Sequence, residues 1–317
     1  MLTSFFGKSN PINYLILAVF IALGYLMGAI SESVVIISVS SIFKHVFFII
    51  ISVVSMLLFD FIIRKNHLTK NNTYAILFFA CFMVMLPIIF LHHKILLANL
   101  FLMLALRRIM SLRNDTNSEK KILDASFWIT IASLFYFWSL LFFVPLYIAI
   151  FQKPNSNYKQ TLIPFTGLFA VIIMNTAFQF IVSDSFVWFF EWKDRISLDF
   201  TSYNSASILV PITVILAFYI WTAVNWILKL PSVPSKNKSN HLLLFYVSFI
   251  SILVALMGPV KTGAEVLFII APLSIIAANY IENFGSERLA DRDMAELRFK
   301  EIMLWVVVLM PFVFLFL

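Results

Sequence analysis

The sequence is poor in charged residues and in cysteine. Only 12% of its 317 residues are charged, 62% are hydrophobic, and the mean hydropathy is +0.96. Soluble domains are about one-quarter charged and about half apolar, so this composition is typical of a protein with many helices in a membrane. The single cysteine, Cys81, lies within an apolar run, which excludes a disulfide framework and a thiolate metal site.

Familiar catalytic motifs are also missing. The chain has no Walker loop, GxGxxG, HExxH or GxSxG motif, and it therefore lacks the residues that mark ATP-driven, nucleotide-linked and zinc-peptidase chemistry. Its 23 Lys and Arg residues outnumber its 16 Asp and Glu residues, but they are scattered between apolar runs rather than gathered into a patch. We expect no nucleic-acid partner and no cofactor, with membrane lipids as the immediate partners.

Apolar runs of membrane-crossing length recur along the chain, since about 20 apolar residues are needed to cross a bilayer. We place these runs at about 11–30, 46–63, 74–91, 95–106, 126–150, 163–182, 206–228, 241–258, 265–282 and 301–317. No clear small-residue cleavage site follows the first run, so we interpret it as a retained helix rather than a signal peptide. The sequence predicts an all-α, polytopic membrane protein in which residues 1–317 form one integral membrane domain.

The run at 126–150 suits either one tilted helix or two short helices folded into a hairpin. Cytoplasmic loops of membrane proteins are enriched in Lys and Arg. A single crossing divides the 23 Lys and Arg residues into 12 inside and 11 outside, whereas a hairpin on the cytoplasmic side leaves five outside and the other 18 inside. We therefore predict about eleven apolar helices including this cytoplasmic-side hairpin, with the N-terminus inside and the C-terminus outside.

Two predicted outer loops have distinctive compositions. In the first, which follows Glu32, apolar residues recur at helical spacing, and this predicts a helix lying in the membrane interface. These residues are Val35, Ile36, Val39, Ile42, Phe43 and Val46. The second loop, 183–204, is rich in Trp and Phe. It is either an aromatic belt at the headgroup level or a set of rings and charges that covers a polar headgroup substrate.

The candidate functional residues all fall on the predicted outer side. Carboxylates near cations at a membrane surface suit a reaction on a phosphate-bearing lipid, because a carboxylate can accept a proton while cations hold the phosphate. Lys261 and Glu265, four residues apart, share a helix face if the helix already begins there, or form a salt bridge at the waterline. His92 and His93 lack the spacing of a helical metal pair, so we assign no metal site. The candidates are Glu32, Lys261, Glu265, Arg195, Lys94, His92 and His93.

Three stretches, MLTSFFGKSNPINYLI, LLANLFLMLALRRI with the following EKKILDASFWITIASLFYFW, and KTGAEVLFIIAPLSIIAANYIE, resemble an uncharacterised family of Bacteroidota inner-membrane proteins. More remotely, the layout is similar to the membrane module of the GT-C glycosyltransferases, which use polyprenyl-phosphate-linked sugars. That resemblance implies that Glu32 is the catalytic base and that Lys261 contacts phosphate. The chain departs from the GT-C pattern in having one acidic residue in the first loop, where those enzymes often have a pair.

Three functions are open at this point. The first is a GT-C-like enzyme of envelope glycan or glycolipid assembly, with Glu32 as base and Lys261, Arg195 and Lys94 as phosphate contacts. The second is a non-catalytic component of an envelope assembly machine, which suits the small loops and the incomplete motif. The third, a transporter, is disfavoured because no acidic or basic residue lies deep in a predicted span. Each of them implies a multi-pass protein of the bacterial inner membrane.

Overall fold

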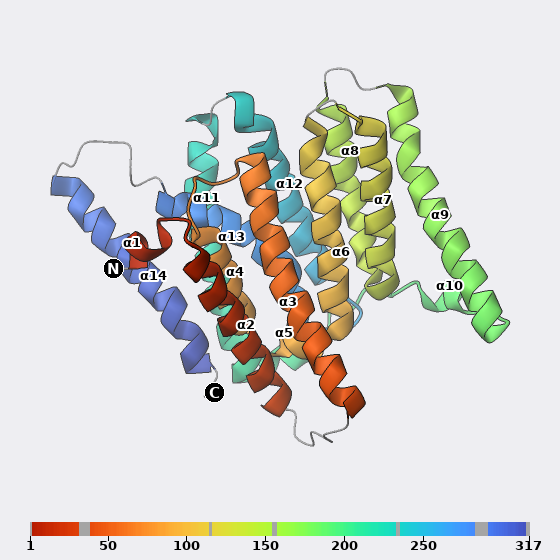
Figure 1. Cartoon of the computed structure of the whole chain (residues 1–317), viewed down its shortest axis with the longest axis horizontal. Helices are drawn as coiled ribbons and strands as arrows, with labels where there is room; N and C mark the ends of the chain where they lie inside the picture. Colours follow the sequence, from red (N-terminus) through yellow and green to blue (C-terminus); the bar gives the residue numbers. More distant parts are fainter. Residues whose placement is uncertain are drawn as a thin grey trace.

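The computed structural model describes residues 2–31, 39–113, 116–153, 157–232, 235–282 and 291–314. All regular structure in these ranges is helical, which confirms the predicted all-α fold (Figure 1). The long helices are α2 (Pro11–Ser31), α3 (Val39–Asn66), α6 (His93–Met110), α7 (Ser118–Phe135), α9 (Tyr158–Ser183), α11 (Ala206–Lys229), α12 (Ser235–Leu256), α13 (Leu267–Glu282) and α14 (Asp291–Phe314). The short ones are α1 (Leu2–Phe6), α4 (Tyr74–Val84), α5 (Ile88–Leu91), α8 (Phe143–Phe151) and α10 (Trp188–Glu191).

Seven helices in the described ranges are long and apolar enough to cross a membrane. They correspond to α2, α3, α6, α9, α11, α12 and α13, while α4 and the segment Phe137–Phe151 are apolar but shorter. The predicted multi-pass membrane character is therefore supported by length and composition. The count of eleven helices and the N-in, C-out orientation stay predictions.

Helices α4 and α13 pack against each other at the centre of the bundle. Every residue of α4 is buried, and Asn279 is the one residue of α13 that is not. Helices α2, α3 and α14 contact α4, helices α11 and α12 contact α13, and α6 contacts both α3 and α13. Uniformly apolar helices such as α4 carry no polar face to mark a lipid or solvent side, because they are surrounded by protein.

The structure corrects two predicted spans. The run at 74–91 is broken, because α4 ends at Val84 and a separate turn, α5, begins after Pro87; proline lacks the N–H that would continue a helix. The run at 95–106 has only 12 residues but is part of the 18-residue helix α6. At 1.5 Å per residue α6 is about 27 Å long, close to the thickness of the hydrocarbon core.

The chain reverses inside the run at 126–150, as the hairpin prediction requires. Helix α7 ends at Phe135, Tyr136 is extended (φ −149°, ψ 102°), and the 3-10 turn η2 (Phe137–Phe142) leads into α8. Helix α8 runs back beside α7 and contacts the 3-10 turn η1 (Ser111–Arg113), which precedes α7 (Figure 1). The predicted start was wrong, since α7 begins at Ser118 rather than near residue 126.

The predicted interface helix is also corrected. Residues 32–38 lie outside the described ranges, and the rest of the segment, from Val39 to Val46, is the beginning of the 28-residue helix α3. At about 42 Å this helix is longer than the hydrocarbon core. Val39 and Phe43 are each 72% exposed, so the apolar periodicity marks the outward face of a membrane helix rather than a separate helix.

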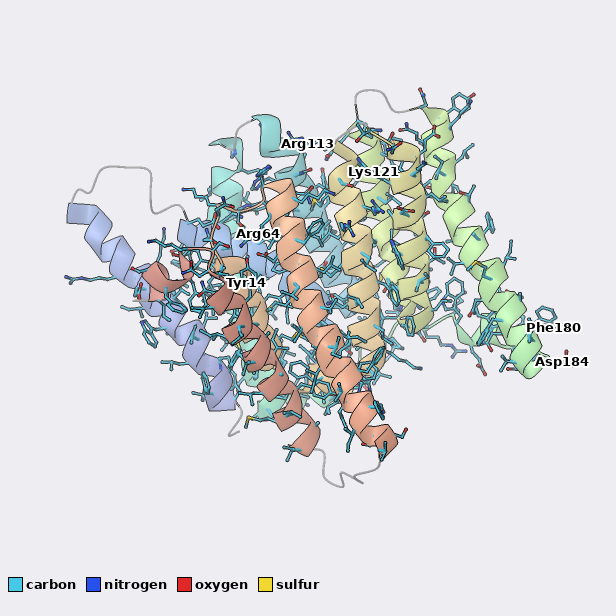
Figure 2. All side chains as sticks on the ribbon, viewed as in Figure 1. Tyr14, Arg64, Arg113, Lys121, Phe180 and Asp184 are labelled. Carbon is cyan, nitrogen blue, oxygen red and sulfur yellow. The ribbon has the colours of Figure 1, made fainter. Side chains whose placement is uncertain are left out.

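The two ends of the bundle carry different residues. Figure 2 shows Arg113 and Lys121 at one end and Asp184 at the opposite end, in agreement with the opposite sides that the charge pattern predicts for them. Helix α10 and the turn α5 lie toward the Asp184 end (Figure 1), which we call the α10 end. The sequence-predicted site residues that the structure describes belong to this end.

Candidate functional site

Lys261 and Glu265 lie in the turn that joins α12 to α13 at the α10 end. Each is only 1% exposed. Lys261 precedes the 3-10 turn η5 (Ala264–Val266), and α13 begins only at Leu267. The expectation that both residues share a helix face is therefore wrong, and the alternative, a salt bridge, is not seen either: the ion pairs within 4.0 Å among the described residues are Arg64–Asp60 and Arg108–Asp124.

Lys261 instead closes the C-terminus of α12. Its Nζ donates hydrogen bonds to the carbonyl oxygens of Ala255, at 3.2 Å, and Leu256. The last carbonyls of a helix have no intrahelical partner and carry a partial negative charge, so a cation stabilises them. Burial lowers the pKa of Lys261, while the negative charge of Glu265 acts to raise it.

Glu265 binds the backbone that enters α13. Its Oε1 accepts a hydrogen bond from the Thr262 N–H and its Oε2 accepts one from the Gly263 N–H, both at 2.8 Å. Gly263 has φ +92°, a conformation that side chains with a Cβ rarely adopt. A carboxylate before a helix also has a favourable interaction with the helix dipole. The two predicted site residues thus serve as caps of successive helices.

Aromatic side chains cover this turn. The Phe200 ring centroid lies 5.5 Å from Lys261 Nζ, and the Tyr203 hydroxyl donates to Glu265 Oε2 at 3.5 Å. Burial and the negative charge of Glu265 raise the pKa of Tyr203. From the hairpin, the Tyr136 hydroxyl donates to the Val254 carbonyl at 3.0 Å. Phe200 and Tyr203, both from the segment 192–204, therefore lie over the two buried side chains Lys261 and Glu265.

The segment 192–204 is fastened to the tip of the α7–α8 hairpin. The indole Nε1 of Trp192 donates to the Ser133 carbonyl at 2.8 Å. Burial raises the pKa of Asp194, while the positive charge of Lys94 and a hydrogen bond from the Phe137 backbone act to lower it. The outer loop, for which an aromatic belt and a cover over a polar substrate were both open, contacts the protein's own Lys261 and Glu265, and it brings Asp194 within electrostatic range of Lys94.

The histidine candidates belong to a second group, which we call the basic group: Lys44, His45, His92 and His93. Lys44, His45 and His92 lie within electrostatic range of His93, and no carboxylate among the described residues does. The His93 ring lies 3.9 Å from the Phe48 ring, and His45 Nδ1 shares a 3.1 Å hydrogen bond with the Tyr25 hydroxyl. Lys44 is exposed, and the three histidines are partly exposed.

The remaining candidates are separate from both groups or outside the described ranges. Arg195 is exposed and makes no hydrogen bond or ion pair with the residues that the structure describes. Lys94 is also exposed and acts on Asp194. Glu32, the predicted catalytic base, falls among residues 32–38 and so lies outside the described residues. No group of three or more His, Cys, Asp and Glu residues in the described ranges could hold a metal ion.

Sequence reasoning missed Lys44 and His45 as neighbours of the HHK run, residues 92–94, and Tyr25 as the partner of His45. Lys44 and His45 fall outside the apolar face of the predicted interface helix, and their approach to His93 depends on the packing of α3 against α6. The signal that could have indicated them is that Lys44 and His45 are adjacent basic residues in an otherwise apolar stretch. Nothing in the sequence pointed to Tyr136 or Tyr203, which act through contacts more than 50 residues away along the chain.

Comparison with known proteins adds a family but no activity. No curated protein and no solved structure matches the chain. Residues 5–317 match the family described as a family of unknown function, DUF6427, and the chain therefore belongs to that family.

Proposed function

We propose that this protein binds the phosphate of a lipid-linked sugar at its α10 end and takes part in the assembly of envelope glycans or glycolipids in a bacterial inner membrane. The observation that carries the proposal is the basic group. Three side chains that are or can become cationic act on His93, and the described residues supply no carboxylate partner for it. Like charges held together repel, and a bound anion relieves that repulsion.

The position of the basic group suits a ligand that reaches it from the bilayer. Lys44 and His45 lie near the beginning of α3, and His92 and His93 lie at the beginning of α6. Both helices are candidate membrane spans, so their ends fall where lipid phosphates are found. A phosphate there receives charge-assisted hydrogen bonds from lysine and histidine, which are among the stronger kind.

In this proposal Glu32 keeps the role of catalytic base, whereas Lys261 and Glu265 are no longer assigned to the substrate. The Lys261 ammonium and the Glu265 carboxylate already bind backbone groups, so using them on a substrate would leave two helix ends uncapped. Glu32 directly follows α2, which ends at Ser31. In a GT-C-like reaction Glu32 would accept the proton of an acceptor hydroxyl while the basic group stabilises the departing lipid phosphate.

A non-catalytic role in the same assembly process is the second candidate. The observation in its favour is that the two charged residues most suggestive of an active site, Lys261 and Glu265, are each 1% exposed and act as caps. A protein that binds a lipid-linked sugar for another enzyme needs the basic group but needs no base. The two candidates therefore differ in what they require of Glu32.

The test is a deletion strain complemented with four versions of the gene, followed by mass spectrometry of lipid-linked sugars and surface glycolipids. The versions are the native gene, Glu32→Ala, the double variant Lys44→Ala/His92→Gln, and the control Lys120→Ala. Lys120 is exposed at the beginning of α7, at the opposite end of the bundle. The substituted residues of the double variant are exposed or partly exposed, so we expect all four proteins to accumulate equally in the membrane.

The outcomes separate the two candidates. If a lipid-linked precursor accumulates in the deletion strain, the control clears it, and both the double variant and Glu32→Ala fail to clear it, the enzyme is supported. If the double variant alone fails, the non-catalytic component is supported. If the deletion leaves every lipid unchanged, or the double variant complements fully, the proposed function is wrong.

A further inference from the structure

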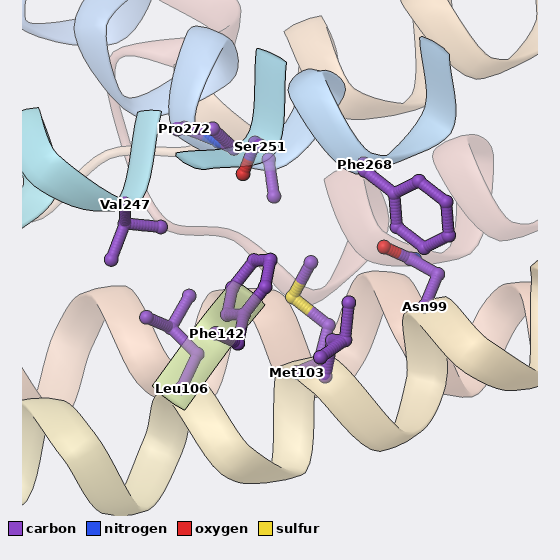
Figure 3. Close-up of a pocket in the computed structure, with 10 residues that line it drawn as sticks. Asn99, Met103, Leu106, Phe142, Val247, Ser251, Phe268 and Pro272 are labelled. Atoms are coloured by element: carbon purple, nitrogen blue, oxygen red, sulfur yellow. The ribbon is translucent and has the colours of Figure 1, made fainter. Parts of the chain in front are cut away.

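A small cavity lies inside the bundle, lined by buried residues. Its lining comes from α6, α12, α13 and the turn η2, and its volume is about 10 Å³, near the room that one water molecule requires. Figure 3 shows the lining side chains, which include Asn99 and Met103 from α6, Ser251 from α12, and Phe268 and Pro272 from α13. None of the ten lining residues is charged.

Two buried polar atoms on this lining have no hydrogen-bond partner. They are Asn99 Oδ1 and Ser251 Oγ, on side chains that are 1% and 0% exposed. Native proteins pair most such atoms, with protein groups or with ordered water. Unpartnered atoms of this kind on the wall of a cavity therefore indicate a ligand that can form hydrogen bonds.

Ser251 differs from three buried serines of the bundle helices and shares its unpartnered hydroxyl with Ser139, which does not line the cavity. Ser52, Ser55 and Ser274 each donate a hydrogen bond to the carbonyl four residues earlier in the same helix, at 2.7–2.9 Å. That bond is the usual way for a serine inside a membrane helix to satisfy its hydroxyl. The Ser251 hydroxyl makes no such bond and lines the cavity instead.

Helix α13 adds a backbone acceptor to the same wall. Pro272 lies inside this helix and has no N–H. The carbonyl of Phe268, four residues earlier, therefore lacks its regular helical donor, and Phe268 is also a lining residue. Carbonyls freed by proline in membrane helices are commonly satisfied by side chains or ordered water.

We propose that this cavity is a hydration site, in which bound water donates a hydrogen bond to Asn99 Oδ1 and exchanges one with Ser251 Oγ. Water fits the volume, and it can both donate and accept. An ion is disfavoured because no charged residue lines the cavity, and intramembrane ions are usually accompanied by ionisable side chains. The lining shares no residue with the basic group, so this inference does not depend on the proposed function.

X-ray radiolytic labelling tests the proposal, because water bound inside a protein yields hydroxyl radicals that oxidise the nearest side chains. Met103 lines the cavity and has a readily oxidised thioether. Met56, which is 0% exposed in α3 and is not among the cavity residues, is the matched control. We expect Met103 in the native, detergent-solubilised protein to be oxidised several-fold faster than Met56.

A variant with an apolar lining completes the test. In Asn99→Leu/Ser251→Val, the oxidation rate of Met103 should fall to that of Met56, with Ser251→Ala as the milder alternative if the double variant does not fold. The proposal is overturned if Met103 in the native protein is oxidised no faster than Met56. It is equally overturned if the fast oxidation of Met103 persists in the folded variant, because the radicals would then come from bulk solvent.

Discussion

The clearest structural prediction concerns Glu265, whose carboxylate accepts the N–H groups of Thr262 and Gly263. A buried N–H without an acceptor costs about 1–3 kcal/mol. Gly263 is buried and Thr262 is partly buried, so Glu265→Ala should lower the free energy of unfolding by about 2–4 kcal/mol. Glu265→Gln keeps one carbonyl oxygen for these donors and should lower it by about half as much.

A buried cysteine allows the unfolding of these variants to be measured. Cys81 is its only cysteine and is 1% exposed in the central helix α4, so a thiol-reactive dye reports the opening of the core during thermal unfolding in detergent. The expected order of melting temperatures is native, then Glu265→Gln, then Glu265→Ala. Glu191→Ala serves as the control, because Glu191 is an exposed carboxylate at the same end and should leave the melting temperature unchanged.

The opposite result would show that the carboxylate is not a cap. If Glu265→Ala unfolds at the native temperature, its hydrogen bonds contribute nothing to stability. If, in addition, the variant fails to complement the deletion strain, Glu265 acts on a substrate and its removal from the proposed binding site is wrong.

Three further outcomes are expected from residues of the same bundle. Gly263→Ala places a Cβ at φ +92°, 2.9 Å from a side chain of α11, and should lower the free energy of unfolding by about 1–3 kcal/mol in the dye assay; an unchanged melting temperature would contradict this. Burial lowers the pKa of Lys261 in the folded protein below the ordinary 10.5 that it has in the unfolded chain. At a pH between the folded and the unfolded pKa, the unfolded chain binds more protons, so the free energy of unfolding rises with pH. The native melting temperature should therefore rise relative to that of Lys261→Met as the pH approaches 10.5. If the two melting temperatures change in parallel with pH, burial does not lower the pKa of Lys261. In a Cys81→Ala background, an impermeant thiol reagent added on the predicted outer side of the membrane should label Lys94→Cys but not Lys120→Cys, and the reverse pattern would invert the predicted orientation.

Much of the fold follows from local properties of the sequence. Apolar runs of membrane-crossing length predict an all-α membrane protein, because backbone groups in a lipid environment must be paired within the helix. The reversal inside the run 126–150 followed from the distribution of Lys and Arg, which differs between the two sides of a membrane. The placement of Lys261, Glu265 and the HHK run at one end of the bundle followed from the same count.

The sequence alone could not decide which charged residues are free to act. Hydropathy treats a helix surrounded by protein like one surrounded by lipid, so nothing marked α4 and α13 as the centre of the bundle. Lys261 and Glu265 resembled an exposed pair, but folding buries both and uses them on the ends of α12 and α13. The basic group forms only when α3 packs against α6, which brings together residues nearly 50 positions apart. Composition and charge thus determined the class of protein and the reversal of the chain within 126–150, whereas tertiary packing decided which side chains are caps and which are available to a ligand.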